Sequence, residues 1–236
     1  MKIQKQLIIT ALLLGVVLLA EQFTSMDIKV QNMFFDFSTC SWVLNKSVNT
    51  VLHFLLYDGI KILIIALSIL VIGLFAYSFK NTKLRQYRYG CLLFILTMAL
   101  VPLTLAGAKK YTNVYCPAQL ACYCADKPYA KVFSSYPPDF DRAANKKGRC
   151  FPAGHASGGF ALMCLFFCFK RKKYKIAGLI TGLSSGLAMG IYQMLRGEHF
   201  LTHTLITMLG AWFIILLLVL FVKRVNKKFP AVAMLD

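Results

Sequence analysis

Residues 204–222 read TLITMLGAWFIILLLVLFV, a run without a single charged side chain. A helix needs about 20 mostly apolar residues to cross a bilayer, and runs of similar length recur along the chain. Apolar residues make up 58% of the 236 positions, more than the roughly 45–50% of soluble domains. The sequence therefore predicts an all-α integral membrane protein, a bundle of six transmembrane helices. The predicted spans are residues 7–23, 62–79, 90–108, 151–169, 176–195 and 204–222.

We expect residues 1–236 to form a single membrane domain, because there is no room for a second, soluble one. Its N-terminal part, residues 1–89, also contains the stretch 41–60, where apolar residues alternate with polar ones from Asn45 to Asp58. This alternation predicts an amphipathic helix on the periplasmic membrane surface. The first span starts like a signal peptide but lacks a good cleavage site, so we expect an uncleaved anchor.

The net charge of +18 suits either nucleic acid or anionic lipid, and the positions of the basic residues decide between them. They cluster beside alternate spans, so a six-span topology places them on one face of the membrane. The positive-inside rule makes that face, with both termini, cytoplasmic. We expect a multi-pass membrane protein, with no nucleic acid among its partners. The clusters are Lys2, Lys5, Lys80, Lys83, Arg85, Arg88, Lys170, Arg171, Lys172, Lys173, Lys175, Lys223, Arg224, Lys227 and Lys228.

This topology places residues 109–150 outside the cytoplasm, although the loop is basic. The positive-inside rule disfavours basic residues on this side, so their presence here indicates an anion-binding surface. The alternative is a solvated loop that faces anionic lipid. The basic residues are Lys109, Lys110, Lys127, Lys131, Arg142, Lys146, Lys147 and Arg149.

Five cysteines fall on the same side, where an oxidising compartment favours disulfides. Because five is odd, at least one of these thiols stays free unless it pairs between chains, and the sequence leaves the oligomeric state open. The spacing of Cys122 and Cys124 also suits a metal, which is the less favoured interpretation outside the cytoplasm. The five are Cys40, Cys116, Cys122, Cys124 and Cys150.

Three of the four histidines lie in two short clusters, FPAGHAS at residues 151–157 and RGEHFLTH at residues 196–203. Ionisable groups at membrane depth are costly and usually functional. The two clusters should meet, because glycine recurs at every fourth position from Gly178 to Gly190 and such a strip lets helices pack closely.

A phosphate ester needs an in-line nucleophile, an acid for the leaving oxygen and neutralisation of its charge. Two imidazoles with an unperturbed pKa of about 6.5 suit the first two tasks. Lys109 and Arg196 would neutralise the phosphate, the arginine in a bidentate mode. Gly154 would contribute a backbone N–H at a helix start, and Ser157 would contribute a hydroxyl.

His203 lies four residues after His199, so on a helix the two share a face. We expect His203 to orient the second ring nitrogen of His199. The same spacing suits zinc, with His155 completing a three-histidine site, so a metal-dependent membrane hydrolase is an alternative. For His53, alone on its segment, we expect a structural role.

In combination the motifs resemble the type 2 phosphatidic acid phosphatase (PAP2) superfamily, which also contains the vanadium haloperoxidases. Its pattern is Lys, six residues, Arg-Pro; then Pro-Ser-Gly-His; then Ser-Arg, five residues, His, three residues, Asp. Here Lys109 with Cys116-Pro117, then Pro152-Ala-Gly-His155, then His199 with His203 stand in the same order within residues 90–222. The resemblance implies a haloperoxidase-like helical bundle with its catalytic core at 90–222, and a mechanism that uses neither a metal nor a cofactor.

The resemblance also implies roles: His199 is the nucleophile, His155 the general acid and Lys109 a phosphate ligand. Several positions depart from the family pattern, and reduced activity or a different substrate geometry would follow from them. Cys116 stands for the first Arg, Ala153 for Ser, Gln193 for the second Arg with Arg196 one turn later, and His203 for the Asp that holds the nucleophile.

These features predict a lipid phosphatase that acts at the periplasmic face through a phosphohistidine. The Gly-x-His-Phe sequence and the cysteine-containing loop are similar to the bacterial lipid A phosphatase branch, and this resemblance implies a location in a bacterial inner membrane. The basic loop suits lipid A, phosphatidylglycerophosphate or undecaprenyl diphosphate as substrate. The alternatives are a lipid phosphotransferase, the metal-dependent hydrolase, and a non-catalytic lipid-binding or transport protein.

Overall fold

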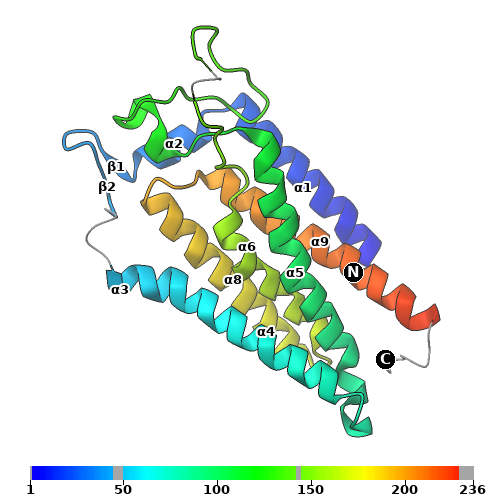
Figure 1. The fold of residues 1–236 in the computed structure, drawn as a ribbon. Coiled ribbons are helices and arrows are strands. Elements are labelled where there is room, and N and C mark those ends of the chain that lie inside the picture. Colours follow the sequence, from blue (N-terminus) through cyan, green and yellow to red (C-terminus); the bar gives the residue numbers. More distant parts are fainter. Residues whose placement is uncertain (1, 45–49, 142–144, 229–236) are drawn as a thin grey trace.

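The computed structural model describes residues 2–44, 50–141 and 145–228. Within them, five helices are long and apolar enough to cross a membrane, so the chain is a multi-pass helical membrane protein (Figure 1). Four of these helices are α1 (Ile3–Phe23), α5 (Arg88–Thr112), α8 (Lys172–Leu195) and α9 (Leu201–Lys228). The other runs continuously through α3 (Thr50–His53), the π-helical turn η1 (Phe54–Asp58) and α4 (Gly59–Tyr77).

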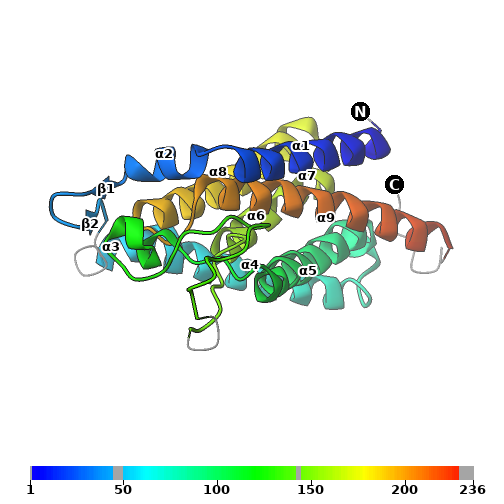
Figure 2. The ribbon, with the colours of Figure 1, turned by 90° about the horizontal axis from the view of Figure 1, so that it is seen from above.

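A shorter apolar helix, Gly154–Cys168, lies between α5 and α8 in the sequence. It consists of η5 (Gly154–Ala156), α6 (Ser157–Ala161), η6 (Leu162–Cys164) and α7 (Leu165–Cys168). Figures 1 and 2 place it at the centre of the bundle, where α6 contacts α5, α8 and α9. At 1.5 Å per residue it is about 22 Å long, shorter than the roughly 30 Å of a bilayer core. The predicted count of six spans is therefore not confirmed.

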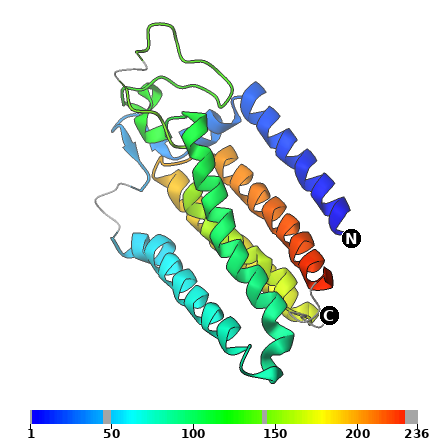
Figure 3. The same cartoon turned by 45° about the vertical axis from the view of Figure 1, so that its right-hand side comes forward.

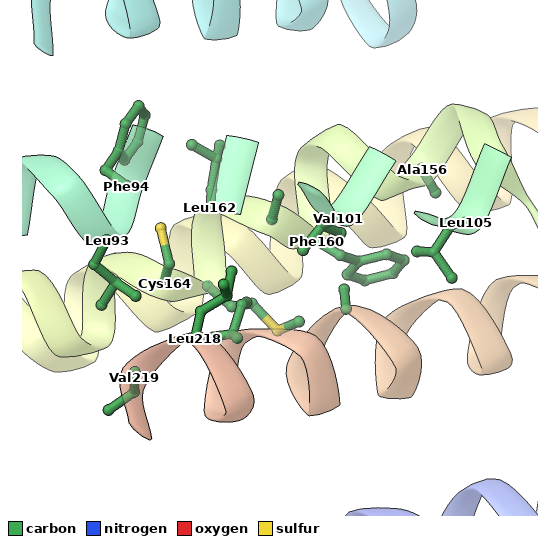
Figure 4. Packing of buried hydrophobic residues seen from close by; sticks show 14 of the residues in the cluster. Leu93, Phe94, Val101, Leu105, Ala156, Phe160, Leu162, Cys164, Leu218 and Val219 are labelled. Carbon is green, nitrogen blue, oxygen red and sulfur yellow. The ribbon is translucent and has the colours of Figure 1, made fainter. Parts of the chain in front are cut away.

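The core of the bundle is apolar and lies where α5, α6 and α9 meet (Figure 4). Phe160 of α6 is fully buried beside Val101 of α5. Where α8 packs against the short central helix, the glycine strip of α8 lacks the side chains that would hold the two helices apart. A Cβ added at Gly182 would lie 2.3 Å from the Met163 backbone nitrogen. The close packing expected from the four-residue glycine spacing is present.

The stretch 41–60 differs from the expected surface helix. Ser41–Trp42 forms strand β2, which pairs with β1 (Phe35–Asp36) in a short hairpin. Residues 45–49 lie outside the described part of the chain. From Thr50 onward the chain belongs to the long helix that ends at Tyr77. Its apolar side chains, such as Phe54 and Leu55, are exposed and continue the apolar surface of α4 instead of starting a separate amphipathic element.

One end of the bundle carries a layer of short elements (Figures 1 and 3). It contains α2 (Met26–Asn32), the hairpin, and the loop after α5 with the 3-10 turns η3 (Pro117–Gln119) and η4 (Ala121–Tyr123). Disulfides join Cys40 to Cys124 and Cys116 to Cys150, and Cys122 keeps a free thiol. We call this layer the cap. Arg142 of the basic loop lies outside the described residues.

The start of α1 and the end of α9 lie at the opposite end of the bundle (Figure 1). The turn η2 (Thr82–Tyr87), which connects α4 to α5, lies there too. The basic clusters that flank the spans and the disulfide-bonded cap are therefore at opposite ends of the molecule.

Candidate active site

The histidines of the two clusters meet just beneath the cap. His155 belongs to the turn η5, and His199 lies in the five-residue link between α8 and α9. The Nδ1 atom of His155 is 3.3 Å from the Nε2 atom of His199. The imidazole of His199 is only 2% exposed, whereas His155 is exposed. One ring is thus held inside the protein and the other faces an open surface.

Lys109, in the last turn of α5, reaches the same place. Its side chain crosses Gly154, where an added Cβ would lie 2.9 Å from the lysine Cε and 3.2 Å from Nζ. Glycine at this position therefore lets the ammonium group approach the backbone of η5. The structure brings together Lys109, Gly154, His155 and His199, which lie in three segments that are far apart in the sequence.

The second ring nitrogen of His199 faces a disulfide. Its Nδ1 atom is 3.3 Å from Sγ of Cys150, and Cys150 is bonded to Cys116. Cys116 stands where the superfamily pattern has its first arginine, so that position now links the first motif covalently to the start of the second. In the sequence, only the position of Cys150, two residues before Pro152, indicated that this cysteine lies near the site.

His203 does not make the contact with His199 that the four-residue spacing predicts. The two ring centroids are 6.0 Å apart, and Nδ1 of His203 is buried without a hydrogen-bond partner. The ring packs edge-on against Phe151 at 5.0 Å and Phe200 at 5.3 Å. The reason is that α9 begins at Leu201, so His199 precedes the helix and the two residues do not share a helical face.

Arg196 and Ser157 are engaged elsewhere. The Nη1 atom of Arg196 is 3.1 Å from Nδ1 of His53 and 3.3 Å from the hydroxyl of Tyr192. The hydroxyl of Ser157 donates a 2.6 Å hydrogen bond to the Gly154 carbonyl and is buried. In this structure Ser157 shapes the turn that carries His155, and Arg196 binds to residues of α3 and α8.

Two residues near the site were not expected from the sequence. His53, predicted to be structural, contacts Arg196 and Tyr192. Tyr57 lies edge-on to the His155 ring, with 5.5 Å between the centroids. Only the four-residue spacing of His53 and Tyr57 could have indicated a shared face, and their segment was expected to lie apart from the histidine clusters.

Burial is the main influence on His199 and lowers its pKa well below the usual value. The positive charge of Lys109 lowers that pKa further, and His203 and His155 act in the same direction. A neutral imidazole has an unprotonated ring nitrogen with a free electron pair. His199 is therefore in the form that can attack an electrophile at neutral pH.

The residues whose donor atoms lie close enough together to share a metal ion are not the three histidines. Within the described ranges, the group whose donor atoms all lie within 4.8 Å of one another is Cys116, Cys150 and His199. Its two sulfurs are bonded to each other. His203 is turned toward two phenylalanines, so the three imidazoles do not converge.

A model of the family described as the PAP2 superfamily matches residues 90–227. The match covers Lys109, His155 and His199 and extends from the start of α5 nearly to the end of α9. No curated protein matches the chain, and no solved structure does.

Proposed function

The chain belongs to the PAP2 superfamily, and from that premise we propose that it removes a phosphate group from a phosphorylated membrane lipid. The observation that carries the proposal is the 3.3 Å approach of His155 Nδ1 to His199 Nε2. With two imidazole nitrogens in one site, one can act as the nucleophile and the other as the general acid. The ammonium group of Lys109 beside Gly154 provides positive charge at the same place.

In the proposed reaction, Nε2 of His199 attacks phosphorus while the bond between phosphorus and the lipid oxygen breaks. His155 gives its proton to the leaving oxygen. Water then attacks the phosphohistidine, His155 takes a proton from that water, and the P–N bond breaks to release inorganic phosphate. The phosphoryl group must enter between the two nitrogens. His155, whose ring is exposed, is the residue that moves aside.

The charge that develops on the phosphoryl oxygens would be stabilised by Lys109 and by the backbone N–H groups of the turn at Gly154. Arg196 would have to leave His53 to join them, with Ser157 supporting the turn. His203 would act through packing instead of through a hydrogen bond. His203 stands at the position of the family Asp, so that position supplies no negative charge to stabilise the positive phosphohistidine.

We place the active site on the periplasmic side of a bacterial inner membrane, with both termini in the cytoplasm. Two observations support this orientation. The disulfides lie in the cap, which favours an oxidising compartment at that end, and the basic clusters lie at the other end, as the positive-inside rule requires.

We also propose that Gly154–Cys168 is the sixth crossing. Its last residue, Cys168, packs against Gly90 at the start of α5, where an added Cβ would be 3.1 Å from the Cys168 carbonyl oxygen. The short helix thus reaches from the histidines to the opposite end of α5. Because protein surrounds it on several sides, its length need not match the hydrocarbon thickness.

The lysines of the loop after α5 suit a multiply charged headgroup, as in lipid A, phosphatidylglycerophosphate or undecaprenyl diphosphate. A lipid alcohol in place of water would make the protein a phosphotransferase, because both acceptors compete for the same phosphohistidine.

The test is phosphate release by the purified protein from these three lipids, with and without EDTA, beside His199→Ala. Release that resists EDTA and is lost in His199→Ala supports the proposal. Release abolished by EDTA indicates a metal-dependent hydrolase. Lipid binding without release, unchanged in His199→Ala, indicates a binding or transport protein.

A further inference from the structure

The link between α8 and α9 contains His199, and side chains of α2 in the cap form hydrogen bonds at both ends of this link. The helix α2 is distant in sequence from the family motifs. Two side chains of α2, Asp27 and Gln31, are 4% and 0% exposed. They are four residues apart and therefore lie on one face of the helix. That face points at the two helix ends between which the catalytic link runs.

Asp27 caps the start of α9. Its carboxylate accepts a 2.9 Å hydrogen bond from the backbone N–H of Thr202 and a second bond from the Thr202 hydroxyl. Thr202 is the second residue of α9, where the N–H has no partner within the helix and negative charge is favoured. The residues that precede the helix, His199 and Phe200, have no side chain of the usual capping type. The cap comes instead from a residue 175 positions away.

Gln31 caps the end of α8. Its side-chain amide donates a 2.8 Å hydrogen bond to the carbonyl of Met194. Met194 is in the last turn of α8, where carbonyl groups lack partners within the helix. One face of α2 therefore fixes both ends of the short link that contains His199.

We propose that Asp27, assisted by Gln31, is a positioning residue that sets the ring of His199 for in-line attack. The inference rests on the proposed function, because it assigns a purpose to the fixed position of that ring. Asp27 does not contact His199. It acts through Thr202, which lies three residues beyond the nucleophile. The missing carboxylate of the third motif makes such an outside support more important here.

The experiment measures binding of orthovanadate by titration calorimetry of the full-length protein in detergent. Orthovanadate is a phosphate analogue that becomes five-coordinate, like the transferring phosphoryl group, when a nucleophile binds to its vanadium. The variants are His199→Ala, Asp27→Ala, Thr202→Val and the double variant that combines Asp27→Ala with Thr202→Val. Thr202→Val keeps the branched shape of the side chain and replaces its hydroxyl by a methyl group. The matched control is Asp36→Asn, which removes an exposed cap carboxylate that hydrogen-bonds only to Ser38 and Thr39 among the contacts of its side chain in the described residues. Thermal unfolding is recorded for each variant.

We expect wild type and Asp36→Asn to bind vanadate equally and His199→Ala to lose binding. Asp27→Ala should bind about 10- to 100-fold more weakly, as a displaced catalytic group does, and Thr202→Val should be weakened to a smaller extent. The double variant should bind no more weakly than Asp27→Ala alone, because the hydroxyl has lost its partner already.

Wild-type affinity in both Asp27→Ala and Thr202→Val would overturn the inference and leave the proposed function standing. If Asp27→Ala does not fold, Thr202→Val decides alone. Absence of His199-dependent vanadate binding in the wild type would overturn the proposed function itself.

Discussion

At the scale of single residues, the proposed chemistry depends on the buried imidazole of His199 and the nearby ammonium group of Lys109. Burial and the charge of Lys109 both disfavour the imidazolium form of His199 and lower its pKa. In the proposed reaction neutral His199 is the nucleophile, so activity should persist below pH 6.5 and fall only when the pH approaches the lowered pKa. The acid limb of kcat/KM, which reports the free enzyme, should therefore lie below the pKa of about 6.5 of an ordinary histidine.

Replacing Lys109 by methionine tests this explanation. Without the positive charge the pKa of His199 rises, so the acid limb should move to higher pH while kcat/KM also falls. Wild type and Lys109→Met are compared on the same substrate, because the titration of the phosphate is then common to both. An acid limb that stays in place would show that the charge of Lys109 does not act on His199.

Gly154 gives a second residue-scale prediction. In Gly154→Ala the new methyl group would meet Lys109 Cε at 2.9 Å, so the flexible lysine must give way. We expect kcat/KM to fall roughly 10- to 100-fold, since a displacement near 1 Å is costly, with thermal stability nearly unchanged. Gly158→Ala is the matched control, because its Cβ would meet only Ile64 at 3.7 Å. Equal activity of the two variants would contradict the role given to Lys109.

The sequence predicted the residues that meet but not all of their contacts. Lys109, His155 and His199 were identified by motif order, and the structure brings them together. The hydrogen bond expected between His203 and His199 is absent, because it depended on where α9 begins. Asp27 was not identified at all, because a carboxylate that caps a helix 175 positions away leaves no local pattern.

At the scale of elements, the site depends on the contact between α8 and the short central helix. An alanine methyl group at Gly182 would lie 2.3 Å from the backbone nitrogen of Met163, which no side-chain rotation relieves. Gly182→Ala should destabilise the protein by about 1–3 kcal/mol, the usual cost of overpacking. Unfolding in detergent measures the effect.

The control is Gly73→Ala in α4, where nothing lies within 4 Å of the added Cβ. In an open helical position alanine is favoured over glycine by up to about 1 kcal/mol. If both variants were equally stable, the glycine strip would not be a packing surface.

Helix positions were predicted well where long apolar runs dominate, as for α1, α5, α8 and α9. The prediction failed at 41–60, where scattered polar residues resembled an amphipathic pattern although residues from 50 onward extend a long apolar helix. The bounds of the short central helix were predicted inexactly for another reason. Its apolar run includes Phe151 and Pro152, which lie before the helix begins at Gly154.

At the scale of the whole molecule, the orientation in the membrane is testable with one native thiol. Cys122 is exposed in the cap, whereas the other free cysteines, Cys91, Cys164 and Cys168, are buried or half-buried. A membrane-impermeant maleimide added to intact spheroplasts should label the wild type and not Cys122→Ser. Labelling of Cys122 only after the membrane is permeabilised would place the cap, and the histidines with it, in the cytoplasm.

The most direct test of the central claim is to trap the covalent intermediate on His199. An aryl phosphate is a suitable probe, because its leaving group departs without a proton from His155. The reaction is quenched with alkali, in which phosphohistidine survives, and the phosphorylated peptide is identified by mass spectrometry. We predict a phosphoryl group on His199 that accumulates in His155→Ala, where water is no longer activated, and is missing from His199→Ala. A phosphoryl group on another residue, or continued turnover by His199→Ala, would contradict the account.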